Sequence, residues 1–294
     1  MSELNPQLPF AVRLLPSRVF YGWYLVAASF LYLMLTAGIG YYALATFLGP
    51  LREAHGWTAG SLGWASASFF VVAGLVGALL GPRVDRVGPV LPQAVSVLLA
   101  AVGVGLAGNV SVIWQLYVAY VLMATAYGIA VAASVNVILT RWFVANRGVA
   151  VAIAFSGNAF AGVLMPPLVV WLVDDFSIGT AGIVIAVVIL AIGLPLLPIL
   201  RVWNPQLAGL DPDNGLLPKR PVKQMGDQHR LWSRKDAVRT VPFWAILIAF
   251  TVILTAENGF RVYQIPFLAD LLGSKTTAAF AYSTMAIANT VTRI

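Results

Sequence analysis

The chain contains no cysteine, only two histidines and few charged residues. Of its 294 residues, 10% are charged and 60% are hydrophobic, whereas a soluble domain carries about 25% charged residues. Without cysteine there is no disulfide framework and no cysteine metal site, and His55 and His229 alone give no zinc-binding cluster. These deficits exclude an ordinary soluble enzyme and a disordered tail, and they indicate a membrane protein with several spans.

Long apolar stretches are what the chain has instead. A transmembrane helix needs about 20 mostly apolar residues, and the stretches that reach or approach this length are residues 23–48, 62–80, 91–107, 113–139, 149–173, 180–200, 241–268 and 277–294. The first six contain no Asp, Glu, Lys or Arg and are rich in Gly, Ala and Ser, which let helices approach closely in lipid. A large soluble helical core is the alternative, and six charge-free spans in succession disfavour it.

The distribution of basic residues predicts the orientation, because cytoplasmic loops carry an excess of Lys and Arg. With a cytoplasmic N-terminus, fourteen of the 18 basic residues fall in cytoplasmic segments, and only Arg52 and Lys275 fall in outer loops. We therefore expect a multi-pass protein of the plasma (cytoplasmic) membrane. Its basic residues set the topology and contact lipid, so nucleic acid is not an expected partner.

A polar, basic loop over residues 201–240 separates six spans from the rest. This layout is typical of transporters built from two six-helix halves. We expect a cytoplasmic N-terminal segment (1–20), a six-helix transmembrane bundle (21–202), a cytoplasmic loop (203–240) and the first two helices of a second bundle (241–294). Two complete halves would need four more spans, so the chain is expected to be C-terminally incomplete.

A short motif follows the second span, in the segment from Gly81 to Pro89. Its pattern, G-x-x-x-D-R-x-G, resembles the signature of the major facilitator superfamily, and the resemblance implies an all-α major facilitator fold with a cytoplasmic gate. Gly81 is expected to allow close packing and Gly88 a tight turn. Asp85, followed by Arg86, is expected to accept hydrogen bonds from a helix N-terminus and to pair with a basic partner. The alternative is a plain turn whose basic residues only set topology.

A second motif points to a subgroup. The segment from Arg141 to Gly157 is similar to the W-F-x-x-x-R-G-x-A-x-G-x-A-x-x-G pattern of monocarboxylate-transporter-like and oxalate/formate-antiporter-like members, with Ala152 in place of a glycine. The segment from Gly209 to Asp213 resembles the P-x-x-L-G-L-x-P-D-G stretch of the same group. The resemblance implies a secondary transporter of small organic anions that works by alternating access.

Charged residues within spans mark candidate sites, because charge is costly in hydrocarbon. Glu257 and Arg261 are four residues apart in the seventh span, so they share one helix face. They predict either a substrate or proton site or a neutralised pair that holds helices together. Tyr41, Tyr42 and Gln264 are candidate hydrogen-bond donors to an anion, although aromatic residues at this depth often form an interfacial belt.

Arg293 is the third charged candidate. Its segment resembles a span-eight motif that ends in Gly-Arg, with Thr292 in place of the glycine and Asn289 where proton-coupled animal transporters carry an aspartate. The resemblance implies that Arg293 pairs with the substrate carboxylate, for which guanidinium offers a bidentate fork. The alternative is an arginine that reaches to the cytoplasmic interface.

The sequence therefore predicts a transporter and not an enzyme. The expected partners are a small organic anion, a coupling proton or counter-anion, and membrane lipid. No cofactor or metal is expected, since neither a phosphate-binding loop nor a catalytic cluster appears. The alternative is a non-transporting truncated fragment or membrane scaffold of the same fold.

Overall fold

The computed structural model describes residues 19–215, 236, 238–274, 277–278, 280–282 and 284–285. Every regular element in these ranges is a helix, and none of the described residues forms a β-strand. The expectation of an all-α chain is therefore confirmed for the described part.

The first predicted span is a continuous helical stretch with an irregular centre. α2 (Tyr21–Tyr32) runs into the π-helical segment η1 (Leu33–Gly38), and η1 runs into α3 (Ile39–His55). At the start of η1 the Thr36 hydroxyl donates a 2.6 Å hydrogen bond to the Tyr32 carbonyl. A side-chain hydroxyl thus binds a main-chain carbonyl at the point where the α-helical hydrogen-bond pattern gives way to the π-helical one.

The next four predicted spans lie on helices that extend beyond the predicted bounds. They are α4 (Ala59–Val87), α5 (Val90–Gly108), α6 (Ile113–Val131) with its π-helical extension η2 (Ala132–Leu139) and the short α7 (Thr140–Trp142), and α8 (Arg147–Asp175). By length and composition, four described helices in this region can cross a membrane.

The sixth predicted span, residues 180–200, is not one uninterrupted helix. α9 (Ile178–Gly193) ends early, and a 3-10 segment, η3 (Leu197–Val202), follows it. Pro195 and Pro198 explain the break, since neither has an N–H to donate to the preceding turn. Two further 3-10 turns complete this part of the chain: η4 (Pro205–Ala208) and η5 (Pro212–Gly215).

Two tyrosines of α2 bind carbonyls at this break. The Tyr32 hydroxyl donates to the Gly193 carbonyl at 2.9 Å, and the Tyr21 hydroxyl donates to the Ile199 carbonyl at 2.7 Å. Both phenol rings are buried. Because an unpaired carbonyl is costly where water is excluded, these bonds hold α2 against the broken end of α9.

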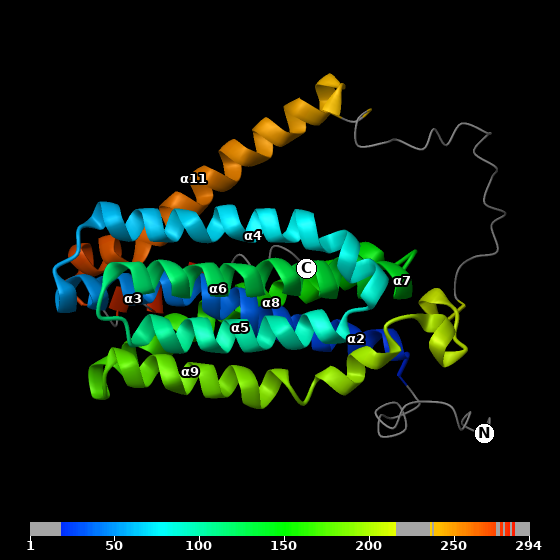
Figure 1. The fold of residues 1–294 in the computed structure, drawn as a ribbon, viewed down its shortest axis with the longest axis horizontal. Coiled ribbons are helices and arrows are strands. Elements are labelled where there is room, and N and C mark those ends of the chain that lie inside the picture. Colours follow the sequence, from blue (N-terminus) through cyan, green and yellow to red (C-terminus); the bar gives the residue numbers. More distant parts are fainter. Residues whose placement is uncertain are drawn as a thin grey trace.

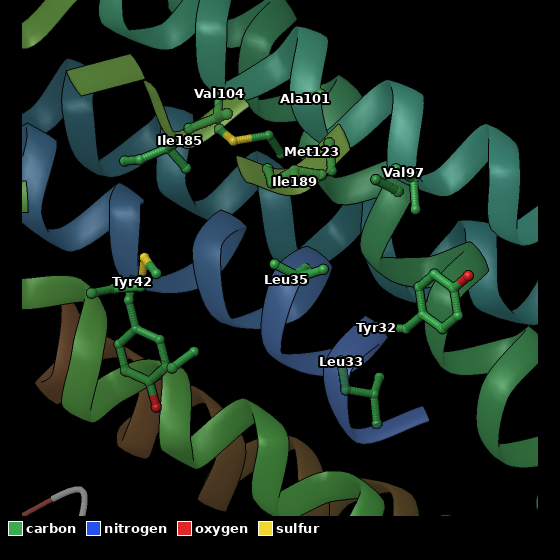
Figure 2. Close-up of a cluster of buried hydrophobic side chains, with 14 of the residues drawn as sticks. Tyr32, Leu33, Leu35, Tyr42, Val97, Ala101, Val104, Met123, Ile185 and Ile189 are labelled. Carbon is green, nitrogen blue, oxygen red and sulfur yellow. The ribbon is translucent and has the colours of Figure 1, made fainter. Parts of the chain in front are cut away.

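The helices pack closely through small residues. α5 lies along α6 and α9, α6 lies along α4, and α8 lies along α2 and α3 (Figure 1). A Cβ at Gly108 of α5 would lie 2.6 Å from the Ile178 carbonyl oxygen and 3.0 Å from the Gly182 Cα. The core between the helices is filled by apolar side chains, among them Val97, Val104, Met123, Ile185 and Ile189 (Figure 2).

Apolar side chains also cover the outside of the helices. On α5, Leu91, Leu98 and Val102 are 64%, 49% and 58% exposed. Their spacing places them on one helix face. A face of this kind suits contact with lipid rather than water, which supports a membrane location.

Basic residues gather at one end of the helices, termed the base-rich end. Among the described residues they are Arg83, Arg86, Arg141, Arg147 and Arg201, in the last turns of α4, in α7, at the start of α8 and in η3. Figure 1 shows these element ends together, on its right side. Arg52, near the C-terminal end of α3, lies at the opposite end.

α11 (Val241–Leu272) contains the seventh predicted span and leaves the other helices obliquely. It contacts α3, and in Figure 1 its C-terminal end lies near α3 whereas its N-terminal end stands apart. All side chains from Trp244 to Glu257 are exposed. Of the eighth predicted span, the described residues between Thr277 and Met285 are helical.

We predict that Gly108→Val destabilises the protein by about 1–3 kcal/mol, the usual cost of overpacking a close contact. The reason is that a Cβ at Gly108 meets the α9 backbone at 2.6 Å. Gly74→Val on α4 is the matched control, since a Cβ at Gly74 meets no atom within 4 Å. Thermal unfolding in detergent should show a lowered melting temperature for Gly108→Val alone. Equal melting temperatures for the two variants would contradict the close α5–α9 contact.

Candidate functional site

Tyr42 lies where α3, α8 and the segment around Tyr282 meet. Its side chain is 3% exposed, and its ring meets the Tyr282 ring edge-on, with centroids 6.0 Å apart. Gly162 of α8 lies against the phenol, since a Cβ there would be 2.6 Å from the ring. Figure 2 shows the Tyr42 ring pointing away from the core residues of α5 and α9. We term Tyr42, Gly162 and Tyr282 the tyrosine junction.

Gln264 joins α11 to the same segment. It is 6% exposed, and its Nε2 donates a hydrogen bond to the Met285 sulfur. Tyr282 and Met285 are three residues apart, and this spacing places them on one side of a helix. Tyr42 and Gln264, both candidates from the sequence, therefore contact the same helix face.

Of the other predicted substrate-binding residues, the structure describes the side chain of Glu257 alone. Glu257 is exposed on α11, which continues without a break through Arg261. Their spacing on one helix face is therefore as the sequence indicated. The side chains of Arg261 and Tyr41, and the whole of Arg293, lie outside the described part of the chain.

The Gly81–Gly88 motif forms the last turns of α4. Gly88 ends the helix with φ 86°, so the expected tight turn is confirmed, and the Trp203 indole covers it, 3.3 Å from the place of a Cβ. The expected close packing at Gly81 is wrong for this arrangement, because α4 runs on through Gly81 and a Cβ there meets no atom within 4 Å. The side chains of Asp85 and Arg86 are exposed.

Arg141 bridges the end of α4 and the segment after α9. Its guanidinium lies 4.2 Å over the Trp203 ring, a cation–π contact, and its Nη2 donates to the Asp85 main-chain carbonyl at 3.5 Å. The sequence predicted a basic partner for the Asp85 carboxylate, whereas the contact with Arg141 runs through the carbonyl. Trp203 also packs against Val84 of α4 and Ala133 of η2.

An aromatic cluster ties the start of α2 to α7. The rings of Phe20 and Tyr21 lie 5.5 Å and 5.4 Å from the Trp142 ring, measured between centroids. Phe143 meets Phe20 at 5.9 Å and Trp23 at 5.2 Å. These contacts fix the α7–α8 turn, at which the W-F motif lies, against the first helix.

Asp213 binds the main chain just before α8. Its Oδ2 accepts the N–H groups of Val144 and Ala145, each at 2.8 Å. Its Oδ1 accepts the Asn146 N–H at 3.4 Å and the Asn146 Nδ2–H at 3.3 Å. Asn146 is the N-cap residue of α8, so Asp213 places a carboxylate at the positive end of a long helix.

Burial of Asp213 opposes ionisation, but these hydrogen bonds outweigh it and hold the pKa of the carboxyl below its usual value. A group with a lowered folded-state pKa stabilises the fold above its ordinary pKa, and the contribution is lost as the pH falls through the lowered value. The interaction is therefore fully present at neutral pH.

Two residues of the base-rich end were not predicted as functional. Trp203 lies in none of the motifs identified in the sequence, and Asp213 was noted only as part of the segment that resembles P-x-x-L-G-L-x-P-D-G. In the described part of the chain, no group of three or more His, Asp or Glu residues is placed to hold a metal ion.

Comparison with known families gives one match. The family model described as Major Facilitator Superfamily matches residues 22–294, which takes in the described helices from the second residue of α2 onward. No curated protein matches the chain.

We predict that Gly162→Val opens the tyrosine junction, because the Tyr42 ring occupies the place of the new side chain. Thr46 lies one turn after Tyr42 and is 7% exposed. Since the chain has no cysteine, Thr46→Cys gives a single reporter for an impermeant maleimide. Labelling should rise at least about threefold with Gly162→Val, as expected for a local opening.

Gly49→Val is the control for this experiment, since a Cβ at Gly49 on the same helix meets no atom within 4 Å. It should leave labelling of Thr46→Cys unchanged. If Gly162→Val and Gly49→Val give the same labelling, the tyrosine junction does not close this region.

Proposed function

Because the chain belongs to the major facilitator superfamily, we propose that it is a secondary active transporter of small organic anions that works by alternating access. Members of this superfamily are multi-pass membrane transporters rather than enzymes. Within the chain we assign residues 21–202 to the first six-helix bundle, 203–240 to the cytoplasmic loop and 241–294 to the first helices of the second bundle.

The observation that carries the proposal is the placement of α11. Alternating access requires two bundles that meet on one side of a central site while they separate on the other. α11 contacts α3, and Tyr282 meets Tyr42 of α3 at the tyrosine junction. Gln264 joins α11 to the segment around Tyr282. Towards the base-rich end, α11 stands apart and its side chains are exposed (Figure 1).

The positive-inside rule assigns the base-rich end to the cytoplasm, together with the N-terminus. With that orientation, in the plasma membrane, the arrangement corresponds to a state that is closed outside and open inside. The gating role of Gly81, Asp85, Arg86 and Gly88 then belongs to the opposite state, in which the cytoplasmic side closes. In the present arrangement the Asp85 side chain is exposed at the end of α4.

A carboxylate is the substrate group that the candidate residues suit. Arg293 and Arg261 offer guanidinium groups, and Tyr41, Tyr42 and Gln264 offer neutral hydrogen-bond donors. Glu257, one turn before Arg261, is the candidate carrier of a coupling proton or the internal partner of an arginine. A counter-anion is the other candidate coupling species. The subgroup resemblance of the Arg141–Gly157 segment supports the same substrate class.

Uptake into proteoliposomes tests the proposal. The full-length natural protein is reconstituted, and labelled monocarboxylates, dicarboxylates, sugars and amino acids are compared with and without a pH gradient or an internal counter-anion. We expect saturable uptake of one carboxylate class that is stimulated by one of the two gradients. Uptake of sugars or amino acids in preference to every carboxylate would contradict the anion assignment, and absence of any uptake would favour a scaffold.

We predict that Arg293→Lys lowers the kcat/KM for carboxylate uptake about tenfold or more, since lysine keeps the charge but loses the bidentate fork. Arg52→Lys is the matched control, because Arg52 lies at the end of α3 outside the proposed site. Both variants should reach the membrane at the parental level. Parental uptake by Arg293→Lys would contradict the carboxylate-binding role of Arg293 and favour the alternative, in which the arginine reaches to the cytoplasmic interface.

A further inference from the structure

The first part of the proposed cytoplasmic loop is ordered by its own short turns. Asn204 begins η4, since its side-chain oxygen accepts the Gln206 N–H at 3.3 Å. The Leu210 N–H then donates to the Pro205 carbonyl at 3.1 Å, after Gly209 turns the chain with φ 65°. We term residues 203–215 the strap.

The strap is attached to the base-rich end at two points. At its beginning, Trp203 lies over Gly88 and under the Arg141 guanidinium, so it contacts both the end of α4 and α7. Near its end, Asp213 accepts three successive main-chain N–H groups in the turn between α7 and α8. The strap therefore contacts the end of α4, α7 and the α7–α8 turn, all of which lie at least about 50 residues before it in the sequence.

The conformation of Asp213 shows that this attachment is specific. Asp213 has φ 53°, and it is the one non-glycine residue with positive φ among the described residues. Such a conformation is disfavoured for residues with a Cβ and persists where the surroundings fix it. Here the surroundings are the four hydrogen bonds to the Asp213 carboxylate, and the residue as a whole is 4% exposed.

We propose that Asp213 is a positioning residue for transport: its carboxylate fastens the strap to the α7–α8 turn, so that the ends of α4, α7 and α8 move together when the first bundle rocks. Asp213 does not touch the substrate and acts through the helices it connects. This role rests on the proposed transport function, whereas the attachment itself does not.

The test of the attachment is hydrogen–deuterium exchange on the full-length protein in nanodiscs. Asp213→Asn is the informative variant, because asparagine also tolerates positive φ but presents an NH₂ group where one carboxylate oxygen accepted N–H groups. We expect the amides of Val144, Ala145 and Asn146 to exchange at least about tenfold faster, as for the loss of hydrogen bonds to a charged acceptor.

Two further variants make the result specific. Asp211→Asn removes an exposed carboxylate two residues away and should leave the exchange of these amides unchanged. Asn146→Asp keeps a good N-cap residue for α8 but places a second carboxylate beside Asp213. Asn146→Asp should raise the exchange of the same amides by less than Asp213→Asn does. If Asp213→Asn does not fold, the exchange of these amides in Asn146→Asp tests the attachment instead. Parental exchange in both Asp213→Asn and Asn146→Asp would overturn the attachment.

Uptake of the transported carboxylate tests the positioning role. With Asp213→Asn we expect turnover per molecule in the membrane to fall at least about threefold with KM within about twofold of the parent, since a slowed conformational step changes turnover more than binding. Faster amide exchange with parental turnover would overturn the positioning role and leave a purely structural attachment. If the parent transports nothing, the proposed function fails, and the exchange experiment still decides the attachment.

Discussion

The constraint on which this structure depends is that main-chain polar groups need partners wherever a helix is interrupted or ends, most of all where burial excludes water. Tyr32 and Tyr21 bind the carbonyls at the broken end of α9. Arg141 donates to the Asp85 carbonyl at the end of α4, and Asp213 accepts the N–H groups before α8. At these three places the main-chain groups are bound by a side chain from another part of the chain, and these contacts connect the first helices to one another.

The contrast between the first helices and α11 gives the structure its functional meaning. The first helices are joined along their length by small residues and at the base-rich end by aromatic, cation–π and carboxylate contacts. α11, by comparison, contacts α3, and its side chains from Trp244 to Glu257 are exposed. In the described part of the chain, α11 and the Tyr282 segment meet the first helices in the region of α3. A bundle that meets its neighbour at one end is suited to rocking about that end, which is the motion that the proposed alternating access requires.

The helices were predictable because the absence of charge over long apolar stretches has one explanation in a chain of this composition. The tight turn at Gly88 was predictable from a motif. The break at the end of α9 was missed because Pro195 and Pro198 were counted within a hydrophobic span. Trp203 and Asp213 were missed for a different reason. Trp203 contacts Gly88 and the Arg141 guanidinium, and Asp213 accepts main-chain N–H groups. Contacts with a glycine or with the main chain leave no pattern in the sequence. Tyr42 and Gln264 were proposed from residue type, and only the structure brings them to one helix face.

The most direct test of the account is a distance measurement across the base-rich end. Nitroxide labels are placed at Val87→Cys at the end of α4 and Ile246→Cys on α11, both exposed positions in a chain without other cysteines. In nanodiscs, the account predicts a long-distance population without substrate and a second, shorter population that grows when the transported carboxylate is added. A single distance that does not change with substrate would contradict alternating access between these two parts of the protein.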